Sequence, residues 1–165
     1  MLLDGSFDYS ESKSNTVDHK NEALNGAKTK TEENEDMELP SWLKPENIMD
    51  KAKHKPDHPD YDPSSLYVPQ SELVNMTPAR KQFWQLKANN FDKILFFKVG
   101  KFYEMYYDDA IICHDLLGLN WTGPLHVGFP EKTIEKYTSI LIQNGFKVAV
   151  AEHLETPSEM KERVK

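Results

Sequence analysis

The chain has 165 residues, a formal net charge of −7 and one cysteine, Cys113. This length allows about one domain and a tail, and a single cysteine excludes an internal disulfide, which is typical of a reducing compartment. The sequence contains no apolar run long enough to span a membrane and no signal peptide, so we expect a protein of the cell interior without a membrane partner.

The acidic charge is confined to the first half of the chain. Residues 1–76 contain 16 acidic and 8 basic side chains, whereas residues 77–165 contain 11 acidic and 12 basic side chains. The overall charge therefore does not argue against a polyanion as partner of the second half. Residues 1–38 are mostly polar and carry few apolar side chains, so we expect them to form a disordered acidic tail.

Residues 39–76 are rich in proline and aspartate, which exclude a long helix and favour turns and extended chain. We expect this segment to lie as an extended linker, or strap, across the surface of the folded domain. Its large apolar side chains are expected to anchor it there: Trp42, Leu43, Tyr61, Leu66 and Tyr67.

The compact domain is expected over residues 77–165, beginning with Thr77 as a helix cap and Pro78 as the first helical residue. The pattern predicts a helix to about residue 90, strands at 94–98 and 102–106, and a helix at 110–117 closed by Gly118. A short strand at 119–121 and a loop that includes Gly128 and Pro130 are expected next. A helix from 134 to about 144, a strand at 146–151 and a short helix after 157 complete the predicted domain. Strands that alternate with helices predict an α/β fold, with a mixed β-sheet flanked by about three helices.

The most informative stretch of this domain runs from Lys98 to Tyr106, where a glycine interrupts an apolar run. Gly100 permits a turn or a close approach of a ligand to the backbone. Phe102 and Glu104 are two residues apart, so in extended chain they point to the same side. A ring beside a carboxylate suits a flat heterocycle, which can stack on the ring and donate a hydrogen bond to the carboxylate.

Each of these features also has a structural explanation. The aromatic side chains, Phe102 included, fit a hydrophobic core with Glu104 on the wet side of a hairpin. Lys98 and Lys101 flank Gly100 and could attract phosphates while a base stacks on the nearby ring. They could equally be solvated lysines at the ends of two strands.

The sequence contains no phosphate-binding G-x-x-x-x-G-K-[ST] loop and no nucleophile elbow. The enzymatic alternative is a metal-dependent nuclease built on carboxylates that lie close in sequence: Glu104, Asp108, Asp109, Asp115 and Glu131. Asp108 and Asp109 also fit the start of a helix, where the helix dipole favours anions. His126 and His153 lack partners at ligand spacing, so we expect ordinary loop or surface residues.

The stretch Gly100-Lys101-Phe102-Tyr103-Glu104 resembles the G-x-F-Y-E signature of the mismatch-recognition domain of the MutS family. The likeness extends from about residue 56 to the end of the chain, and it is closest to the branch of eukaryotic MutS homologue six. Further segments resemble, in order, the strap before that domain and parts of the domain itself: Pro56–Asp62, Leu66–Pro69, Gly128–Glu131 and Glu155–Pro157.

The resemblance implies a role in DNA mismatch repair in the nucleus. In this family the phenylalanine of the signature wedges into the duplex and stacks on a mispaired base, while the glutamate hydrogen-bonds the same base; Phe102 and Glu104 stand at these positions. A mispaired base is cheaper to unstack than a paired one, and an apolar wedge kinks the duplex. Lys101 occupies the variable position, where we expect a phosphate contact, and Gly100 and Lys98 complete the predicted DNA-binding set.

The resemblance also implies partners: double-stranded DNA with mismatches, and MutS homologue two as heterodimer partner of the full-length family member. The family's ATP and magnesium belong to an ATPase domain absent from this chain, so we expect no catalytic residue, cofactor or metal here. The recognition domain is expected to be truncated at its C-terminal end. Two alternatives remain, a metal-dependent nuclease and a non-catalytic protein-interaction domain whose core includes Phe102.

Overall fold

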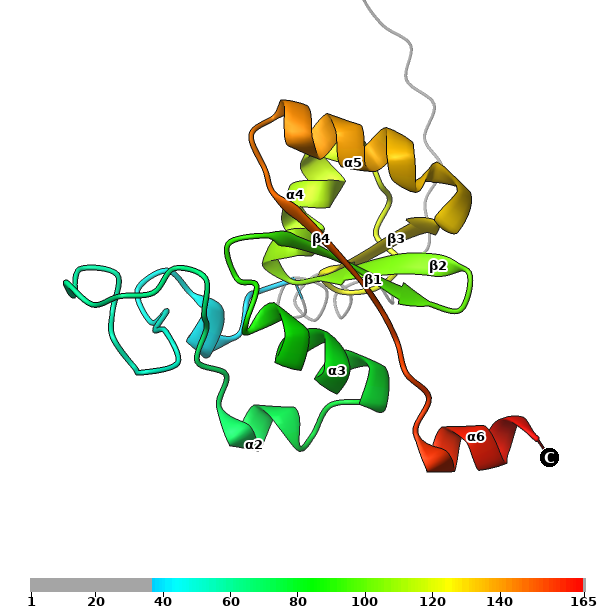
Figure 1. The fold of residues 1–165 in the computed structure, drawn as a ribbon, viewed down its shortest axis with the longest axis horizontal. Coiled ribbons are helices and arrows are strands. Elements are labelled where there is room, and N and C mark those ends of the chain that lie inside the picture. The colour runs from blue at the N-terminus through cyan, green and yellow to red at the C-terminus, as the bar shows by residue number, and fades with distance from the viewer. Residues whose placement is uncertain (1–36, 165) are drawn as a thin grey trace, which may run out of the picture.

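The computed structural model describes residues 37–164. The predicted disordered tail, residues 1–38, lies outside the described residues except for its last two. The elements in chain order are a 3-10 helix η1 (Ser41–Leu43), α2 (Gln70–Leu73), α3 (Pro78–Lys87), β1 (Ile94–Val99), β2 (Phe102–Tyr106), α4 (Asp108–Leu117), β3 (His126–Pro130), a 3-10 helix η2 (Glu131–Thr133), α5 (Ile134–Gln143), β4 (Val148–Glu152) and α6 (Pro157–Arg163) (Figure 1).

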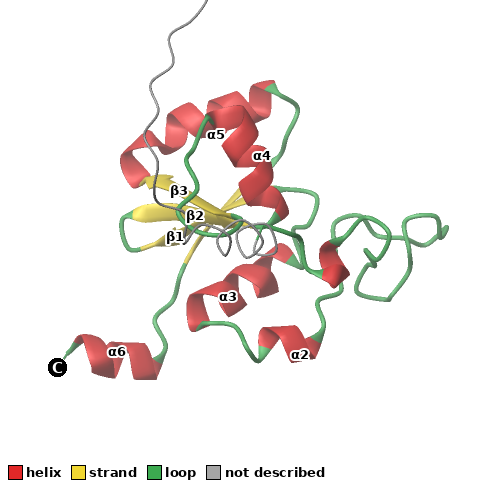
Figure 2. Cartoon of the chain, turned by 180° about the vertical axis from the view of Figure 1, so that it is seen from behind, coloured by secondary structure: helices red, strands yellow, loops and turns green. Residues whose placement is uncertain are grey.

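The strands form one four-stranded sheet in the order β3-β2-β1-β4. β1 pairs antiparallel with β2 and parallel with β4, and β2 pairs antiparallel with β3. Helices α4 and α5 cover one face of the sheet and α3 lies against the other, while α6 stands apart beyond the end of β4 (Figures 1 and 2). This arrangement confirms the predicted α/β fold with a mixed sheet and three flanking helices. None of the helices in residues 37–164 has the length and apolar character needed to cross a membrane.

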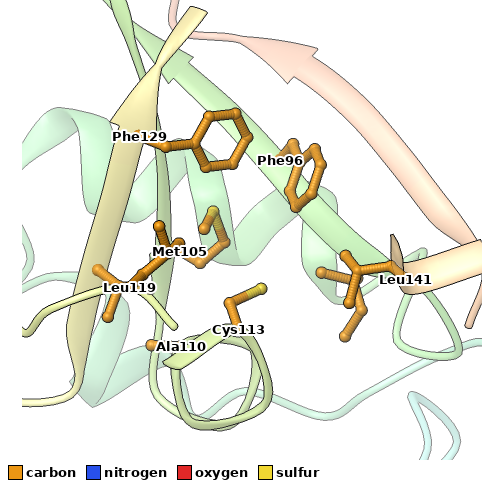
Figure 3. Packing of buried hydrophobic residues seen from close by; sticks show 9 residues of the cluster. Phe96, Met105, Ala110, Cys113, Leu119, Phe129 and Leu141 are labelled. Atoms are coloured by element: carbon orange, nitrogen blue, oxygen red, sulfur yellow. The ribbon is translucent and has the colours of Figure 1, made fainter. Parts of the chain in front are cut away.

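Alternation along the strands supplies a separate core to each face of the sheet. The first core lies between the sheet and helices α4 and α5 (Figure 3). It includes Phe96, Met105, Ala110, Cys113, Leu119, Phe129 and Leu141. Burying each large apolar side chain contributes about 1.5–3 kcal/mol, so this cluster fixes the position of α4 and α5 on the sheet.

The second core lies on the opposite face and is shared between α3 and the segment before it. Trp42, Leu43 and Leu66 from residues 39–76 are buried there with Phe83 and Trp84 of α3. The rings of Trp42 and Trp84 meet edge to face, with centroids 4.9 Å apart. Residues 39–76 thus pack against α3 without forming a strand, and their buried apolar side chains belong to the core of the domain.

A buried ion pair joins the helical layers to the sheet. Lys87 of α3 donates to Asp109 of α4 with an Nζ–Oδ1 distance of 2.8 Å, and each side chain is only 1% exposed. The second oxygen of Asp109 accepts the backbone N–H of Leu95 at 3.0 Å, and Lys87 also donates to the carbonyl of Lys93. Removing one partner of such a pair leaves a buried charge unpaired, at a cost of about 3–5 kcal/mol.

One predicted strand is wrong. Residues 119–121 form no strand; the strand lies instead at β3, where a loop was expected. Gly128 and Pro130 disfavour the interior of a sheet, which is why the sequence indicated a loop. β3 is an edge strand with Pro130 as its last residue, and edge strands tolerate a proline because one side of the strand needs no partner.

Candidate functional site

A two-residue turn joins β1 to β2 and carries the predicted signature. Val99 pairs with Phe102, so Gly100 and Lys101 alone form the hairpin loop. Gly100 has φ +63°, and two-residue hairpin turns require a positive φ at their first residue. A side chain at this position would be strained, which explains the glycine and confirms its predicted role as a turn residue.

Phe102 is the first residue of β2 and is 52% exposed. Its neighbours Tyr103 and Met105 face the core beneath α4 and α5, whereas Phe102, Glu104 and Tyr106 point to the other face of the sheet. The interpretation of Phe102 as a core residue is therefore wrong. A phenylalanine at the tip of a hairpin, with half of its surface in water, is available for contact with a ligand.

Glu104 lies beside two aromatic groups, both of which are close to the same carboxylate oxygen. The hydroxyl of Tyr106 donates to Glu104 Oε2 at 2.9 Å, and His126 Nε2 lies 3.7 Å from the same oxygen. The rings of Tyr106 and His126 are stacked, with centroids 4.5 Å apart and an interplanar angle of 22°. The register brings these groups together, because His126 pairs with Tyr106, and Gly128 pairs with Glu104.

This environment favours the ionised form of Glu104. The neighbouring imidazole of His126 has the largest effect and lowers the pKa of Glu104; burial opposes this, and the hydrogen bond from Tyr106 lowers the pKa further. Burial raises the pKa of Tyr106, so its hydroxyl keeps its proton and remains a donor. Glu104 is thus a carboxylate at neutral pH, able to accept hydrogen bonds but not to donate them.

The two predicted lysines differ in their surroundings. Lys101 is exposed in the hairpin turn, and its carbonyl accepts the N–H of Glu131 at 2.9 Å. Lys98 alternates to the face opposite Phe102 and Glu104, where its Nζ lies 3.0 Å from Glu131 Oε2 and 3.8 Å from Glu152 Oε1. The structure therefore brings Gly100, Lys101, Phe102 and Glu104 together at the hairpin but sets Lys98 apart from them.

The carboxylates of the nuclease alternative do not converge. Asp109 is committed to Lys87, Glu131 to Lys98, and Glu104 faces His126 on another side of the sheet. In residues 37–164 no group of three or more His, Cys, Asp or Glu side chains is placed to hold a metal ion. This part of the chain therefore contains no set of ligands that could hold a metal ion for a metal-dependent reaction.

Sequence reasoning missed two residues of this site, His126 and Gly128. His126 was expected to be an ordinary loop or surface residue, but it lies in β3 beside Glu104. A Cβ atom on Gly128 would lie 3.0 Å from the carbonyl oxygen of Tyr103 and 3.7 Å from Cγ of Glu104. Only the pairing of β3 with β2 reveals both roles, and the sequence indicated no strand there.

Comparison with known proteins identifies the domain that carries this hairpin. The family model described as MutS domain I matches residues 77–165. A probable DNA mismatch repair protein Msh6 of Drosophila melanogaster is 48% identical over 126 residues, which cover 75% of this chain and 11% of that protein.

More distant relatives agree with this result. Human DNA mismatch repair protein Msh6 is 46% identical over 127 residues, covering 74% of this chain and 9% of that protein. The DNA mismatch repair protein MutS of Caulobacter vibrioides is 41% identical over 95 residues, covering 53% of this chain and 10% of that protein. The chain spans about a tenth of the length of these relatives. It belongs to the MutS family and is similar to Msh6 within it.

Proposed function

We propose that this chain is a module that binds DNA at mispaired bases and serves DNA mismatch repair without a reaction of its own. One observation carries the proposal: Phe102 is 52% exposed at the tip of a hairpin in a MutS domain I, with the carboxylate of Glu104 on the same face. The ring therefore presents an apolar face outside the core, on which a base can stack.

The proposed mechanism uses Phe102 as a wedge. Inserted between base steps, its ring stacks on the mispaired base and kinks the duplex. The module distinguishes mispaired from matched DNA because unstacking a mispaired base costs less free energy than unstacking a base in a matched pair. Glu104, held as a carboxylate, then accepts a hydrogen bond from the displaced base.

The proposed phosphate contacts come from the turn. Lys101 is exposed beside Phe102 and can approach the backbone of the duplex, which positions the wedge without reading sequence. Gly100 allows the backbone to turn tightly at this point. Lys98 is the weakest member of the predicted DNA-binding set, because Glu131 and Glu152 already neutralise it.

The wider biological setting is also part of the proposal. Because the relatives are named as DNA mismatch repair proteins and several are eukaryotic, we expect the full-length protein to act in the nucleus. We expect it to pair with MutS homologue two, as the family resemblance implies. ATP and magnesium are expected to act in other domains of the full-length protein, so mismatch binding by this chain needs no cofactor.

The test is binding of this chain to a matched duplex and to the same duplex with one G·T mispair, at about 50 mM and about 200 mM salt. It compares the wild type with Phe102→Ala and with the control Ile142→Ala. Ile142 is 58% exposed on α5, which covers the other face of the sheet. The control therefore removes a similarly exposed apolar side chain from a different surface.

We expect the wild type and Ile142→Ala to prefer the mispaired duplex and Phe102→Ala to lose that preference while keeping its circular dichroism spectrum. A folded Phe102→Ala protein with an undiminished preference would contradict the proposal. Equal, salt-sensitive binding of both duplexes by the wild type would also contradict it, because charge alone would then account for binding.

A further inference from the structure

We propose that His126, together with Tyr106, holds one oxygen of Glu104 in place and thereby presents the other oxygen to the mispaired base. His126 is on this view a positioning residue that sharpens mismatch discrimination without touching the base. The inference rests on the proposed function, because it assigns a role within the same mismatch-reading site.

The geometry singles out one oxygen of Glu104. Oε2 accepts the hydroxyl of Tyr106 at 2.9 Å and lies 3.7 Å from His126 Nε2. The other oxygen, Oε1, has no hydrogen-bond partner among residues 37–164. The carboxylate is therefore engaged by the protein on one side and open on the other, as a group that reads a ligand must be.

The imidazole of His126 needs a partner. Its Nε2 atom is buried and has no hydrogen bond in the described part of the chain. A buried polar atom without a partner is unfavourable, which favours any small shift that provides one. A movement of Glu104 Oε2 by about 0.8 Å toward His126 Nε2 would make a hydrogen bond of normal length. Binding of a base at Oε1 can fix the carboxylate in the position that completes this bond.

The backbone of His126 and the ring of Tyr106 are themselves held by neighbouring groups. The backbone of His126 donates to the carbonyl of Gly123 at 3.2 Å, and its carbonyl accepts the N–H of Thr122 at 2.9 Å. The ring of Tyr106 packs edge to face on Phe83 with centroids 4.9 Å apart, and the guanidinium of Arg80 lies 4.9 Å from the centre of the Tyr106 ring. A carboxylate held by rigid neighbours loses less rotamer freedom when it binds, so its hydrogen bond to the base contributes more.

The test measures mismatch discrimination, defined as the ratio of the dissociation constants for the matched and G·T duplexes, in a double-mutant cycle. His126→Leu removes the donor, His126→Gln keeps an N–H group, and Glu104→Ala removes the group that is held. We expect His126→Leu to lower the ratio by about tenfold, the equivalent of one hydrogen bond, and His126→Gln to retain most of it. In the Glu104→Ala background, His126→Leu should have no further effect.

Tyr106→Phe provides a second route, because it removes the hydroxyl and keeps the buried ring; it should lower the ratio even where His126→Leu does not fold. An unchanged ratio in folded His126→Leu and Tyr106→Phe, with discrimination lost in Phe102→Ala, would overturn this inference and leave the proposed function standing. If His126→Leu lowered the ratio equally in the wild type and in the Glu104→Ala background, the inference would be overturned too, since His126 would then act independently of Glu104. Undiminished discrimination in Phe102→Ala would instead overturn the proposed function itself.

Discussion

At the scale of single residues, Asp108 has an unusual environment for an acid. It is the first residue of α4, and its Oδ1 atom is buried without a hydrogen-bond partner in residues 37–164. Burial, and then the neighbouring carboxylate of Asp109, raise the pKa of Asp108 to about 7. The folded protein thus keeps a proton on Asp108 over a pH range in which the unfolded chain, with an ordinary aspartate pKa, has lost it.

This difference predicts that the stability gained from Asp108→Asn depends on pH. The contribution of Asp108 to the stability of the wild type falls as the pH rises from about 4 to about 7, because the unfolded state releases this proton first. The amide does not titrate, so Asp108→Asn should be more stable than the wild type at pH 8, by about 1–3 kcal/mol, and similar to it at pH 4. Urea unfolding at both pH values measures this difference.

The matched control is Asp115→Asn, an exposed aspartate on the same helix. It removes one charge from α4 without affecting a buried group, so its effect should be small and nearly the same at the two pH values. A gain for Asp108→Asn that is equal at pH 4 and pH 8 would show that the proton on Asp108 is not its cause.

The residue scale also shows what the sequence could predict about the site. The two-residue spacing placed Phe102 and Glu104 on one face because alternation is a local property of a strand. Whether that face was covered could not be predicted, because Tyr106 on the same face is buried against Phe83 while Phe102 is exposed. The difference depends on where α3 packs along the sheet, which only the tertiary structure determines.

At the scale of elements, β3 links the edge of the sheet to the candidate site. It supplies His126 beside Glu104, and Gly128 opposite it. Gly128 leaves room for the backbone of Tyr103 and the side chain of Glu104, both of which a Cβ atom would crowd. The sequence could not predict this strand, because glycine and proline are evidence against a strand until its position at the edge is known.

This crowding predicts a cost for Gly128→Ala. The added methyl would lie 3.0 Å from the carbonyl oxygen of Tyr103, so β3 must shift away from β2 by a few tenths of an ångström. We expect a loss of about 1–3 kcal/mol in the free energy of unfolding, together with weaker mismatch discrimination because Glu104 is displaced.

Thermal unfolding and duplex binding measure the two effects of Gly128→Ala. Gly123→Ala is the matched control, since a Cβ atom there would meet only the side chain of His126, at 3.8 Å. A Gly128→Ala protein as stable as Gly123→Ala would mean that β3 adapts without strain.

At the scale of the whole molecule, residues 39–76 are part of the hydrophobic core. The sequence predicted a strap with five apolar anchors. Trp42, Leu43 and Leu66 are buried, whereas Tyr61 and Tyr67 are only half-buried. What the three buried anchors pack against could not be predicted, because their contacts with Phe83 and Trp84 of α3 span tens of residues. The N–H of Leu66 also donates to the carbonyl of Ala88 at 2.9 Å, which ties the strap to the end of α3.

The strap should therefore contribute to the stability of the domain that carries the hairpin. Leu66 is 1% exposed, so Leu66→Ala should cost about 2–5 kcal/mol, the usual cost of a cavity in a core. Val74→Ala is the matched control, because Val74 belongs to the same segment and is 61% exposed. Denaturant unfolding compares them; equal stability of the two variants would contradict the inclusion of the strap in the core.

The central claim is that Phe102 stacks on a mispaired base, and photocrosslinking tests it most directly. The probe is the chain with p-benzoylphenylalanine in place of Phe102, irradiated with a duplex containing one G·T mispair or with its matched counterpart. A second protein with the same group in place of Ile142 is the control and measures crosslinking that arises from random contact with the duplex. We predict that crosslinks from position 102 map to the mispaired base or its immediate neighbours and are much weaker with the matched duplex. The same crosslinks with both duplexes, or crosslinks confined to sites away from the mispair, would contradict the claim.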